Sequence, residues 1–373
     1  MLKMRWQTLV ILTGMLLVMC TLILGSIAKA SPQSAGGSGY KLANKFTLGG
    51  PGSWDYLEID PATHRVFISR GTHVMVVDPE SGKVLGDIPN TMGVHGIALA
   101  PEFNHGFTSN GMSGTATMFD MTTLQALGEP KTEKGPDAII YDPGSKRVFT
   151  MNGAGNSATA IDAKTGEVAG SVALGGAPEF AAADGKGHVF ANLEDKSALV
   201  EIDSKALTLM NTWPLAPCDS PSGLAIDTKN NRLVVGCHNK MMAFVDGSTG
   251  KVVGTVAIGT GVDANKFDPG TGFAFASCGD GTITVAHEDS PDKFTVVDTI
   301  QTQNGARTMA VDYANHTVVT VTAQFEAPPA VTPAPPAAPP AAGGAPGAPP
   351  AARGGYRRPA MVPDTFTLLV FKK

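Results

Sequence analysis

Residues 135–152 read Gly-Pro-Asp-Ala-Ile-Ile-Tyr-Asp-Pro-Gly-Ser-Lys-Arg-Val-Phe-Thr-Met-Asn, and residues 158–168 read Ala-Thr-Ala-Ile-Asp-Ala-Lys-Thr-Gly-Glu-Val. Short apolar runs alternate here with Asp-Pro-Gly and Lys-Thr-Gly segments, which is typical of β-strands joined by tight turns. The two stretches together therefore predict four short strands. Aromatic residues make up only 6% of the chain and glycines number 44, which favours many short strands over packed helices.

The same unit recurs along the chain. When each copy is registered on the residue that ends its first strand, seven copies appear at intervals of 40 to 44 residues, at Asp60, Ala100, Asp142, Asp184, Asp227, Asp268 and Asp312. A period of this length with four strands in each copy is typical of propeller blades. We therefore predict an all-β fold, a single seven-bladed β-propeller with four-stranded blades, over residues 40–326 and 364–373.

The two ends of the chain complement each other. The last copy supplies two strands and, after an insertion, a third at Thr365–Phe371, but it lacks a fourth. The isolated strand Tyr40–Leu48 precedes the first copy and has the pattern of a fourth strand, such as Lys251–Ile258. We predict that this N-terminal strand closes the last blade, because closure removes the exposed strand edges of an open stack.

A Pro/Ala-rich insertion, residues 327–363, interrupts the last blade. Residues 327–352 contain only Ala, Pro, Gly, Val and Thr, a composition that favours polyproline II with flexible breaks and cannot form a core. We predict a disordered, solvated loop. The alternative is a tether or docking arm for a partner or for the cell wall.

The N-terminus has the pattern of a targeting segment. Lys3 and Arg5 precede the apolar run Thr8–Gly25, and Ala28-Lys-Ala30 fits a small-x-small cleavage site. We predict a signal peptide over residues 1–30, a flexible leader over residues 31–39, and a periplasmic or secreted mature protein. The mature chain then has no membrane span; the alternative is that the apolar run is retained as an anchor.

The charge balance bears on the class of partner. Residues 1–30 contain three of the 28 basic residues and no acidic residue, so the remaining chain has 25 basic and 33 acidic residues, a net charge of −8. Binding to a phosphate backbone requires a basic surface, and none is visible in the sequence. We therefore expect a protein or small-molecule ligand, not a nucleic acid, and a monomeric protein.

These motifs resemble a known family. Gly135–Asp142, Arg147–Asn152 and Ala160–Val168 are similar to the repeats of YVTN-repeat propellers of the YncE-like type, and the Tyr-Val-x-Asn element occurs as Phe149-Thr-Met-Asn152 and Phe107-Thr-Ser-Asn110. It is degenerate in the other copies. The resemblance implies a propeller outside the cytoplasm, but such folds serve as binding proteins and as enzymes. A WD40 repeat is excluded because the single Trp-Asp pair lies at the start of a blade.

One position of the repeat is polar in every copy. Five residues before each registered position stand Asp55, His95, Asp137, Glu179, Ser222, Asp263 and Arg307. The innermost strand begins here, so we predict a ring of candidate ligand-binding residues at one mouth of the central channel. Carboxylates this close raise one another's pKa unless a cation offsets them. Arg307 can offset one or two, and a bound divalent cation or cationic ligand would offset more; the alternative is ordinary solvated polar side chains.

An odd number of cysteines remains in the expected mature chain, for which an oxidising compartment favours one disulfide and one leftover cysteine. Cys20 falls in the expected signal peptide, which leaves Cys218, Cys237 and Cys278. Cys218 precedes the first strand of the fifth copy and Cys237 ends its second strand, so a Cys218–Cys237 disulfide is the favoured pairing. The state of Cys278 stays open. No Cys-x-x-Cys-His segment occurs, which argues against covalent haem, and the cofactor is otherwise unassigned.

Two functional classes follow. The favoured one is an extracytoplasmic binding or scaffold protein that uses the channel mouth and its surrounding face to bind a partner or a small ligand. The alternative is a propeller enzyme of the lactonase, lyase or dehydrogenase type, with a metal or substrate at the acidic ring. In that case Asp137, Glu179 or Asp263 would hold the metal or act as base, with His95 as proton shuttle and Arg307 on an anionic group.

Overall fold

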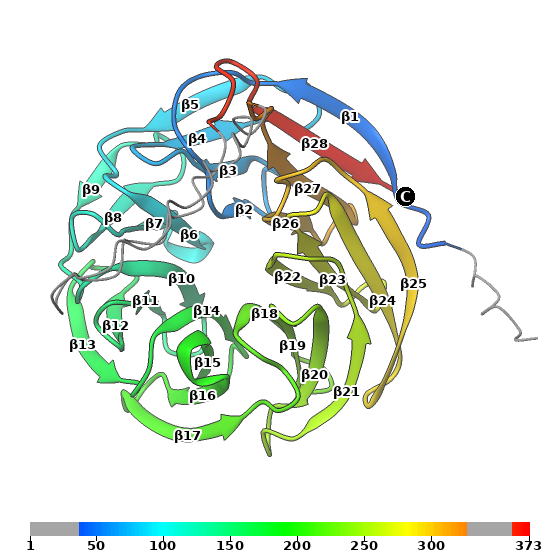
Figure 1. The fold of residues 1–373 in the computed structure, drawn as a ribbon. Coiled ribbons are helices and arrows are strands. Elements are labelled where there is room, and N and C mark those ends of the chain that lie inside the picture. The colour runs from blue at the N-terminus through cyan, green and yellow to red at the C-terminus, as the bar shows by residue number, and fades with distance from the viewer. Residues whose placement is uncertain (1–36, 327–359) are drawn as a thin grey trace, which may run out of the picture. The chain divides into compact units, whose positions relative to one another are not determined.

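The computed structural model describes residues 37–326 and 360–373, which form seven four-stranded antiparallel sheets arranged around a central channel (Figure 1). The seven-bladed β-propeller predicted from the repeat is therefore confirmed. The expected signal peptide and residues 327–359 of the Pro/Ala-rich insertion lie outside the described residues. Within the described part of the chain, no helix has the length and hydropathy needed to cross a bilayer.

Blades 1 to 6 each use four consecutive strands, with the first strand innermost (Figure 1). Blade 1 contains β2 (Leu57–Ile59), β3 (Val66–Ser69), β4 (Val74–Val77) and β5 (Val84–Ile88). Blade 2 contains β6 (Val94–Ala100), β7 (His105–Asn110), β8 (Thr115–Asp120) and β9 (Ala126–Gly128). Blade 3 contains β10 (Pro136–Asp142), β11 (Arg147–Asn152), β12 (Ser157–Asp162) and β13 (Val168–Ala173). Blade 4 contains β14 (Pro178–Ala183), β15 (His188–Leu193), β16 (Ala198–Asp203) and β17 (Thr208–Pro214). Blade 5 contains β18 (Pro221–Asp227), β19 (Arg232–Cys237), β20 (Met241–Asp246) and β21 (Val252–Ala257). Blade 6 contains β22 (Val262–Asp268), β23 (Phe273–Cys278), β24 (Thr282–Ser290) and β25 (Lys293–Gln301).

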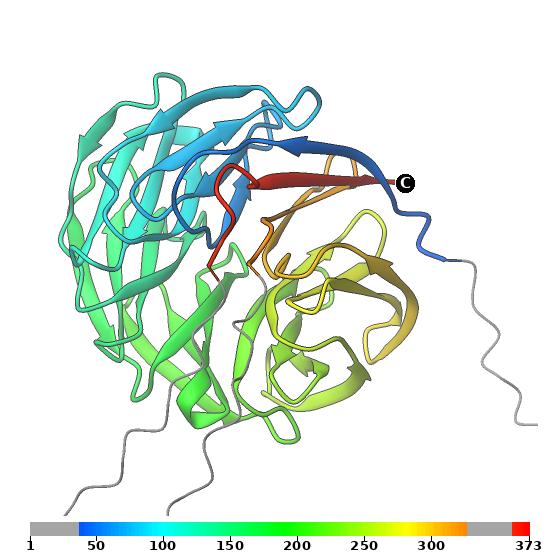
Figure 2. The ribbon, with the colours of Figure 1, turned by 45° about the horizontal axis from the view of Figure 1, so that its top comes forward.

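Blade 7 joins the two ends of the chain, as predicted. Its strands, from rim to channel, are β1 (Lys41–Thr47), β28 (Thr367–Lys372), β27 (Thr317–Thr322) and β26 (Met309–Asp312). β1 pairs antiparallel with β28 from Lys41 opposite Lys372 to Thr47 opposite Thr367. Figure 2 shows the two strands side by side at the edge of the ring. Strand β1 therefore holds the ring closed through main-chain hydrogen bonds.

The turn after each innermost strand explains the aspartates of the repeat. Asp142 accepts hydrogen bonds from the amides of Gly144 and Ser145, each at 3.0 Å, because a short carboxylate reaches the backbone two and three residues ahead. Blade 2 has Ala100 at this position, and the short 3₁₀ helix η1 (Pro101–Phe103) makes the turn there. A second 3₁₀ turn, η2 (Glu194–Lys196), follows β15.

The hydrophobic core lies between the blades. Among the described residues, buried apolar side chains form seven clusters, one at each interface between neighbouring blades. Each blade is therefore clamped on both faces, which fixes the innermost strands relative to one another. The residues at the start of those strands inherit this rigidity. We call the face on which the innermost strands begin the top face.

Candidate functional site at the channel mouth

The seven ring residues predicted from the repeat all lie at the top of the innermost strands. Five belong to β6, β10, β14, β18 and β22, and Asp55 and Arg307 precede β2 and β26 by two residues. Hydrogen bonds from the preceding blade fix the backbone at this level. Asn192 Nδ2 donates to the carbonyl of Ser222 at 2.7 Å, and Thr308 Oγ1 donates to that of Asp55 at 2.7 Å. Such supports make a preorganised site.

Arg307 neutralises two of the ring carboxylates. Its Nε lies 2.5 Å from Asp263 Oδ2, and its Nη2 lies 3.2 Å from Asp55 Oδ1. The offset of one or two carboxylates expected from the sequence is therefore present. These two ion pairs use Nε and Nη2 of the guanidinium, and Arg307 also lines the cavity described below.

His95 joins a second pair of carboxylates. Its Nδ1 lies 2.7 Å from Asp55 Oδ2 and 3.6 Å from Asp137 Oδ1. One ligand atom from each of these three residues can be chosen so that all lie within 4.8 Å of one another. Imidazole nitrogen and carboxylate oxygen are common ligands of divalent metals. This cluster is the part of the described chain that is best suited to hold a metal ion.

A cavity of about 1160 Å³ opens at the channel mouth. Six of the seven ring residues line it; the exception is Asp137, which contacts His95 instead. The carboxylate of Glu179 forms no ion pair or hydrogen bond with any described residue. The buried Oδ1 of Asp137 accepts no hydrogen bond within the described chain, and the buried indole Nε1 of Trp54, in the cavity wall, has no partner there either.

The surroundings of the ring residues shift the pKa values of several of their side chains. Burial, followed by the charge of Asp137, raises the pKa of Glu179 to about 8. Burial also raises the pKa of Asp137 to about 6, against the opposing effect of His95. The hydrogen bond to Asp55 raises the pKa of His95. The surroundings of Glu179 therefore favour its protonated form, mainly because burial penalises the carboxylate charge and nearby carboxylates add to that effect.

Two aromatic residues meet across the channel below the ring. The rings of Tyr56 and Phe180 meet edge to face with centroids 5.0 Å apart. They follow directly after ring residues of blades 1 and 4, which are not neighbours, so their contact crosses the channel. Sequence analysis missed this pair. The signal was present: at the position after the ring residue, the other five copies have only Gly, Ala or Thr.

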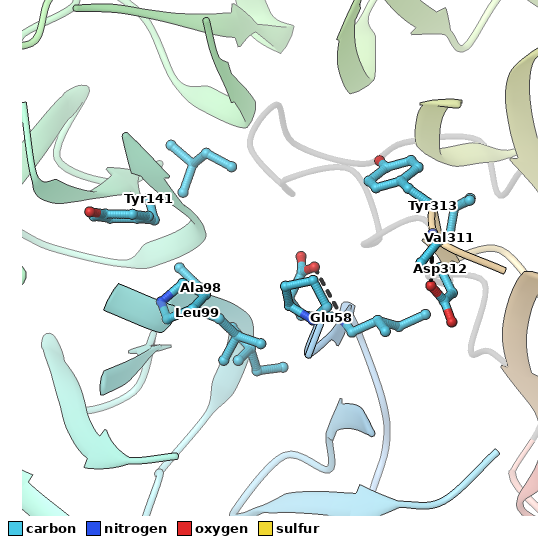
Figure 3. A pocket seen from close by; sticks show the side chains of 13 residues that line it. Glu58, Ala98, Leu99, Tyr141, Val311, Asp312 and Tyr313 are labelled. Carbon is cyan, nitrogen blue, oxygen red and sulfur yellow. Dashed lines mark hydrogen bonds between the residues drawn. The ribbon is translucent and has the colours of Figure 1, made fainter. Parts of the chain in front are cut away.

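A second, smaller pocket lies at the opposite end of the channel. It measures about 250 Å³ and includes Glu58, Tyr141 and Tyr313 (Figure 3). Asp312, also in its wall, is paired with His64 at 2.8 Å, and Glu58 lies 3.9 Å from Lys266 Nζ. Its charged groups thus have counter-charges close by, in contrast to Glu179 at the top.

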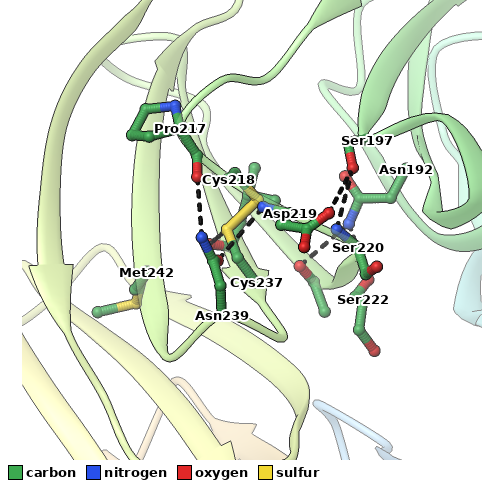
Figure 4. Close-up of a disulfide and its surroundings, with 12 residues drawn as sticks. Asn192, Ser197, Pro217, Cys218, Asp219, Ser220, Ser222, Cys237, Asn239 and Met242 are labelled. Atoms are coloured by element: carbon green, nitrogen blue, oxygen red, sulfur yellow. Dashed lines mark hydrogen bonds between the residues drawn. A yellow bond between two sulfur atoms is a disulfide. The ribbon is translucent and has the colours of Figure 1, made fainter.

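A disulfide fixes one edge of the upper cavity. The structure pairs Cys218 with Cys237, the pairing that the sequence favoured, with a Cα–Cα distance of 5.4 Å (Figure 4). His238, which follows Cys237, lines the cavity and donates its amide to the carbonyl of Asp219 at 3.0 Å. The bridge therefore ties the two loops that bring His238 and Ser222 to the mouth. Cys278 is a buried free thiol.

Comparison with known proteins supports the fold and no more. No protein-family model matches the sequence, and no curated protein matches it. A solved structure is similar: hydrazine synthase of Kuenenia stuttgartiensis, with 15% sequence identity and a TM-score of 0.64, over 74% of this chain and 94% of that one. At this identity the likeness shows a shared β-propeller architecture.

The chemistry open to the mouth follows from its charges. Four carboxylates line the cavity, and the one guanidinium among its lining residues, that of Arg307, is already paired with two of them, Asp55 and Asp263. A positive group entering the cavity would meet Glu179 directly and would favour its ionised form. An anion would face the same carboxylates, and Arg307 is already paired with two of them. The geometry therefore suits a metal cation, an ammonium group or a guanidinium group.

Proposed function

We propose that the protein is an extracytoplasmic binding protein of the YVTN-repeat, YncE-like type, whose channel-mouth cavity holds a positively charged group. The observation that carries this proposal is Glu179, a carboxylate in the wall of a large cavity with no cationic partner among the described residues. Arg307, the arginine of the ring, stands three blades away from Glu179 and is paired with Asp55 and Asp263.

The aromatic contact across the channel adds to this proposal. Tyr56 and Phe180 meet beneath the ring, and the cavities at the two ends of the channel share no lining residue. A ligand entering from the top face therefore meets a cavity that is separate from the pocket at the other end, and charges in a partly buried site interact more strongly than in open water. This is how binding pockets with a few convergent polar groups usually work.

Placement outside the cytoplasm rests on two features. Residues 1–30 have the charge and hydropathy pattern of a signal peptide. The Cys218–Cys237 bridge is typical of proteins that fold in an oxidising compartment.

A thermal-shift series with cations tests the proposal. The purified protein is dialysed against chelator and then heated with Mn²⁺, Ca²⁺ or n-butylammonium, with choline as a bulky control cation. We expect at least one of the first three to raise the melting temperature, and Glu179→Gln to lose most of that shift. Glu58→Gln, in the pocket at the other end of the channel, is the matched control and should keep it. No shift with any cation would contradict the proposal.

A metal-dependent enzyme is the second candidate. It is favoured by the Asp55, His95 and Asp137 cluster, whose ligand atoms lie within 4.8 Å of one another. Here the protein residues would hold the ion and leave positions open for water or substrate. Metal analysis separates the two candidates: a stoichiometric divalent ion that is lost in His95→Gln supports the enzyme, whereas binding of an ammonium ion does not require the imidazole.

A further inference from the structure

The large apolar side chains that are exposed on the top face gather on one side of it. Among the described residues, the twelve exposed large hydrophobic side chains fall into three groups. Eight lie on the outermost strands of the blades, and Tyr313 lies on the opposite face. The remaining three, Met92, Met112 and Phe325, lie on the top face. They come from blade 7 and from the loops around blade 2.

These side chains stand at the edge of the cavity. Phe325 is part of its wall and pairs through its backbone with Met361, which also lines it. Gly93 is another wall residue, and a β-carbon at Gly93 would lie 2.5 Å from Met112 Cγ, so Met112 rests directly on the rim. We refer to Met92, Met112, Phe325 and Met361 as the apolar arc.

The arc is open to solvent to a degree that calls for an explanation. Met112 is 78% exposed, Met92 45% and Phe325 37%. The corresponding loops of the other blades carry Gly, Ala, Asn, Asp, Lys and similar residues, for example Gly279-Asp-Gly281 in blade 6 and His238-Asn-Lys240 in blade 5. Exposed apolar residues that cluster beside a cavity, instead of being scattered, mark interaction surfaces.

We infer that the top face docks a protein partner that inserts a lysine or arginine side chain into the cavity and lays the apolar residues beside it on the arc. This inference rests on the proposed function, since it names the bearer of the positive group. A buried basic anchor with apolar contacts around it is the usual arrangement of an interface hot spot. Methionine suits such surfaces because its flexible thioether adapts to different shapes.

The position of Met112 favours a protein over a small molecule. A ligand small enough to fit the cavity would neutralise Glu179 yet leave the most exposed side chain of the arc in water. A polypeptide covers both at once, because residues on either side of the basic one lie outside the cavity. The acidic balance of the chain, with 33 acidic against 28 basic residues, also favours a partner with a basic surface.

Selection from a display library of short random peptides tests the inference. The protein without its expected signal peptide, residues 1–30, is immobilised. Bound peptides are then counter-selected on the Asp137→Asn/Glu179→Gln variant. We expect the enriched peptides to share a lysine or arginine flanked by apolar residues. Synthetic copies of the enriched peptides should bind Met92→Ser/Met112→Ser about tenfold more weakly than they bind the wild type, as measured by fluorescence anisotropy. Leu127→Ser, at an equally exposed outer-strand position of the same blade, is the control and should bind normally.

The outcomes separate this inference from the proposed function. If n-butylammonium binds through Glu179 but no basic, apolar peptide is enriched, the protein-docking inference is wrong and cation binding stands. Enriched peptides without a basic residue, or peptides insensitive to the arc variant, also overturn it. If neither n-butylammonium nor a metal ion binds, the proposed function itself fails.

Discussion

Tyr56 and Phe180, from blades 1 and 4, meet edge to face across the central channel with ring centroids 5.0 Å apart. Most contacts in a propeller join neighbouring blades, so this pair adds a direct link across the ring. It also places a phenol under the acidic ring: burial, together with the charges of ring carboxylates, raises the pKa of Tyr56 well above its usual range. The contact thus joins opposite sides of the channel below the acidic ring.

Removing the Tyr56 ring should destabilise the propeller. Tyr56→Ala deletes a large buried aromatic side chain, for which about 3 kcal/mol of unfolding free energy is a reasonable expectation. Tyr56→Phe retains the packing and should cost well under half of that. Denaturant unfolding of both variants measures the difference. Equal stability of Tyr56→Ala and the wild type would show that the ring does not pack as described.

Glu179 should make the protein less stable as the pH rises. Its pKa is about 8 in the folded state and 4.5 as the ordinary value, so folding favours the protonated form. The stability that this gives is fully present below about pH 4.5 and is lost as the pH rises through about 8. Glu179→Gln stays neutral and should therefore match the wild type near pH 4.5 but exceed it by roughly 1–2 kcal/mol above pH 8. Chelated, cation-free samples unfolded by denaturant across this range provide the measurement, and a gap that does not grow with pH would refute the assignment.

Strand β1 should be required for the stability of the whole ring. Deleting residues 31–48 removes every partner of the outer edge of β28, from Lys41 to Thr47. The transition should move to clearly lower denaturant concentration as one cooperative step, because blade 7 then presents an open edge. Deleting residues 31–36 alone leaves β1 intact and is the control. An unchanged midpoint for the longer deletion would mean that closure contributes little.

The Cys218–Cys237 bridge should stabilise both the fold and the site. The two cysteines are 19 residues apart, so loss of the bridge is expected to cost about 3 kcal/mol on the chain-entropy account. Cys218→Ser/Cys237→Ser should also weaken cation binding, because His238 and Ser222 line the cavity on loops that the bridge joins. Cys278→Ser is the control, because it replaces a buried free thiol and leaves the bridge intact. Unchanged cation binding in Cys218→Ser/Cys237→Ser would show that the bridge does not support the site.

The repeat made the fold predictable. A period of 40 to 44 residues sets the blade, and the missing fourth strand of the last copy places Tyr40–Leu48 in it; the observed β1 spans Lys41–Thr47. The aspartates that end the innermost strands are local turn chemistry, which sequence expresses directly. Ala100 broke the pattern, and a 3₁₀ turn stands there instead.

The site was predictable in location but not in pairing. Register alone brought seven polar residues to one level, yet it could not show that Arg307 serves Asp55 and Asp263 or that Asp137 turns toward His95. Those choices depend on side-chain conformations and on distances across the channel. The apolar arc was equally hidden, because a methionine such as Met112 looks the same in sequence whether it is buried or 78% exposed.

Calorimetric titration with n-butylammonium or Mn²⁺, in buffers that differ in ionisation enthalpy, tests the central claim most directly. If the cavity holds a cation at Glu179, whose pKa is about 8, binding at neutral pH should release a proton and tighten as the pH rises toward 8. Both effects should disappear in Glu179→Gln and persist in Glu58→Gln. Absence of binding, or binding without proton release that Glu179→Gln leaves unchanged, would contradict the account.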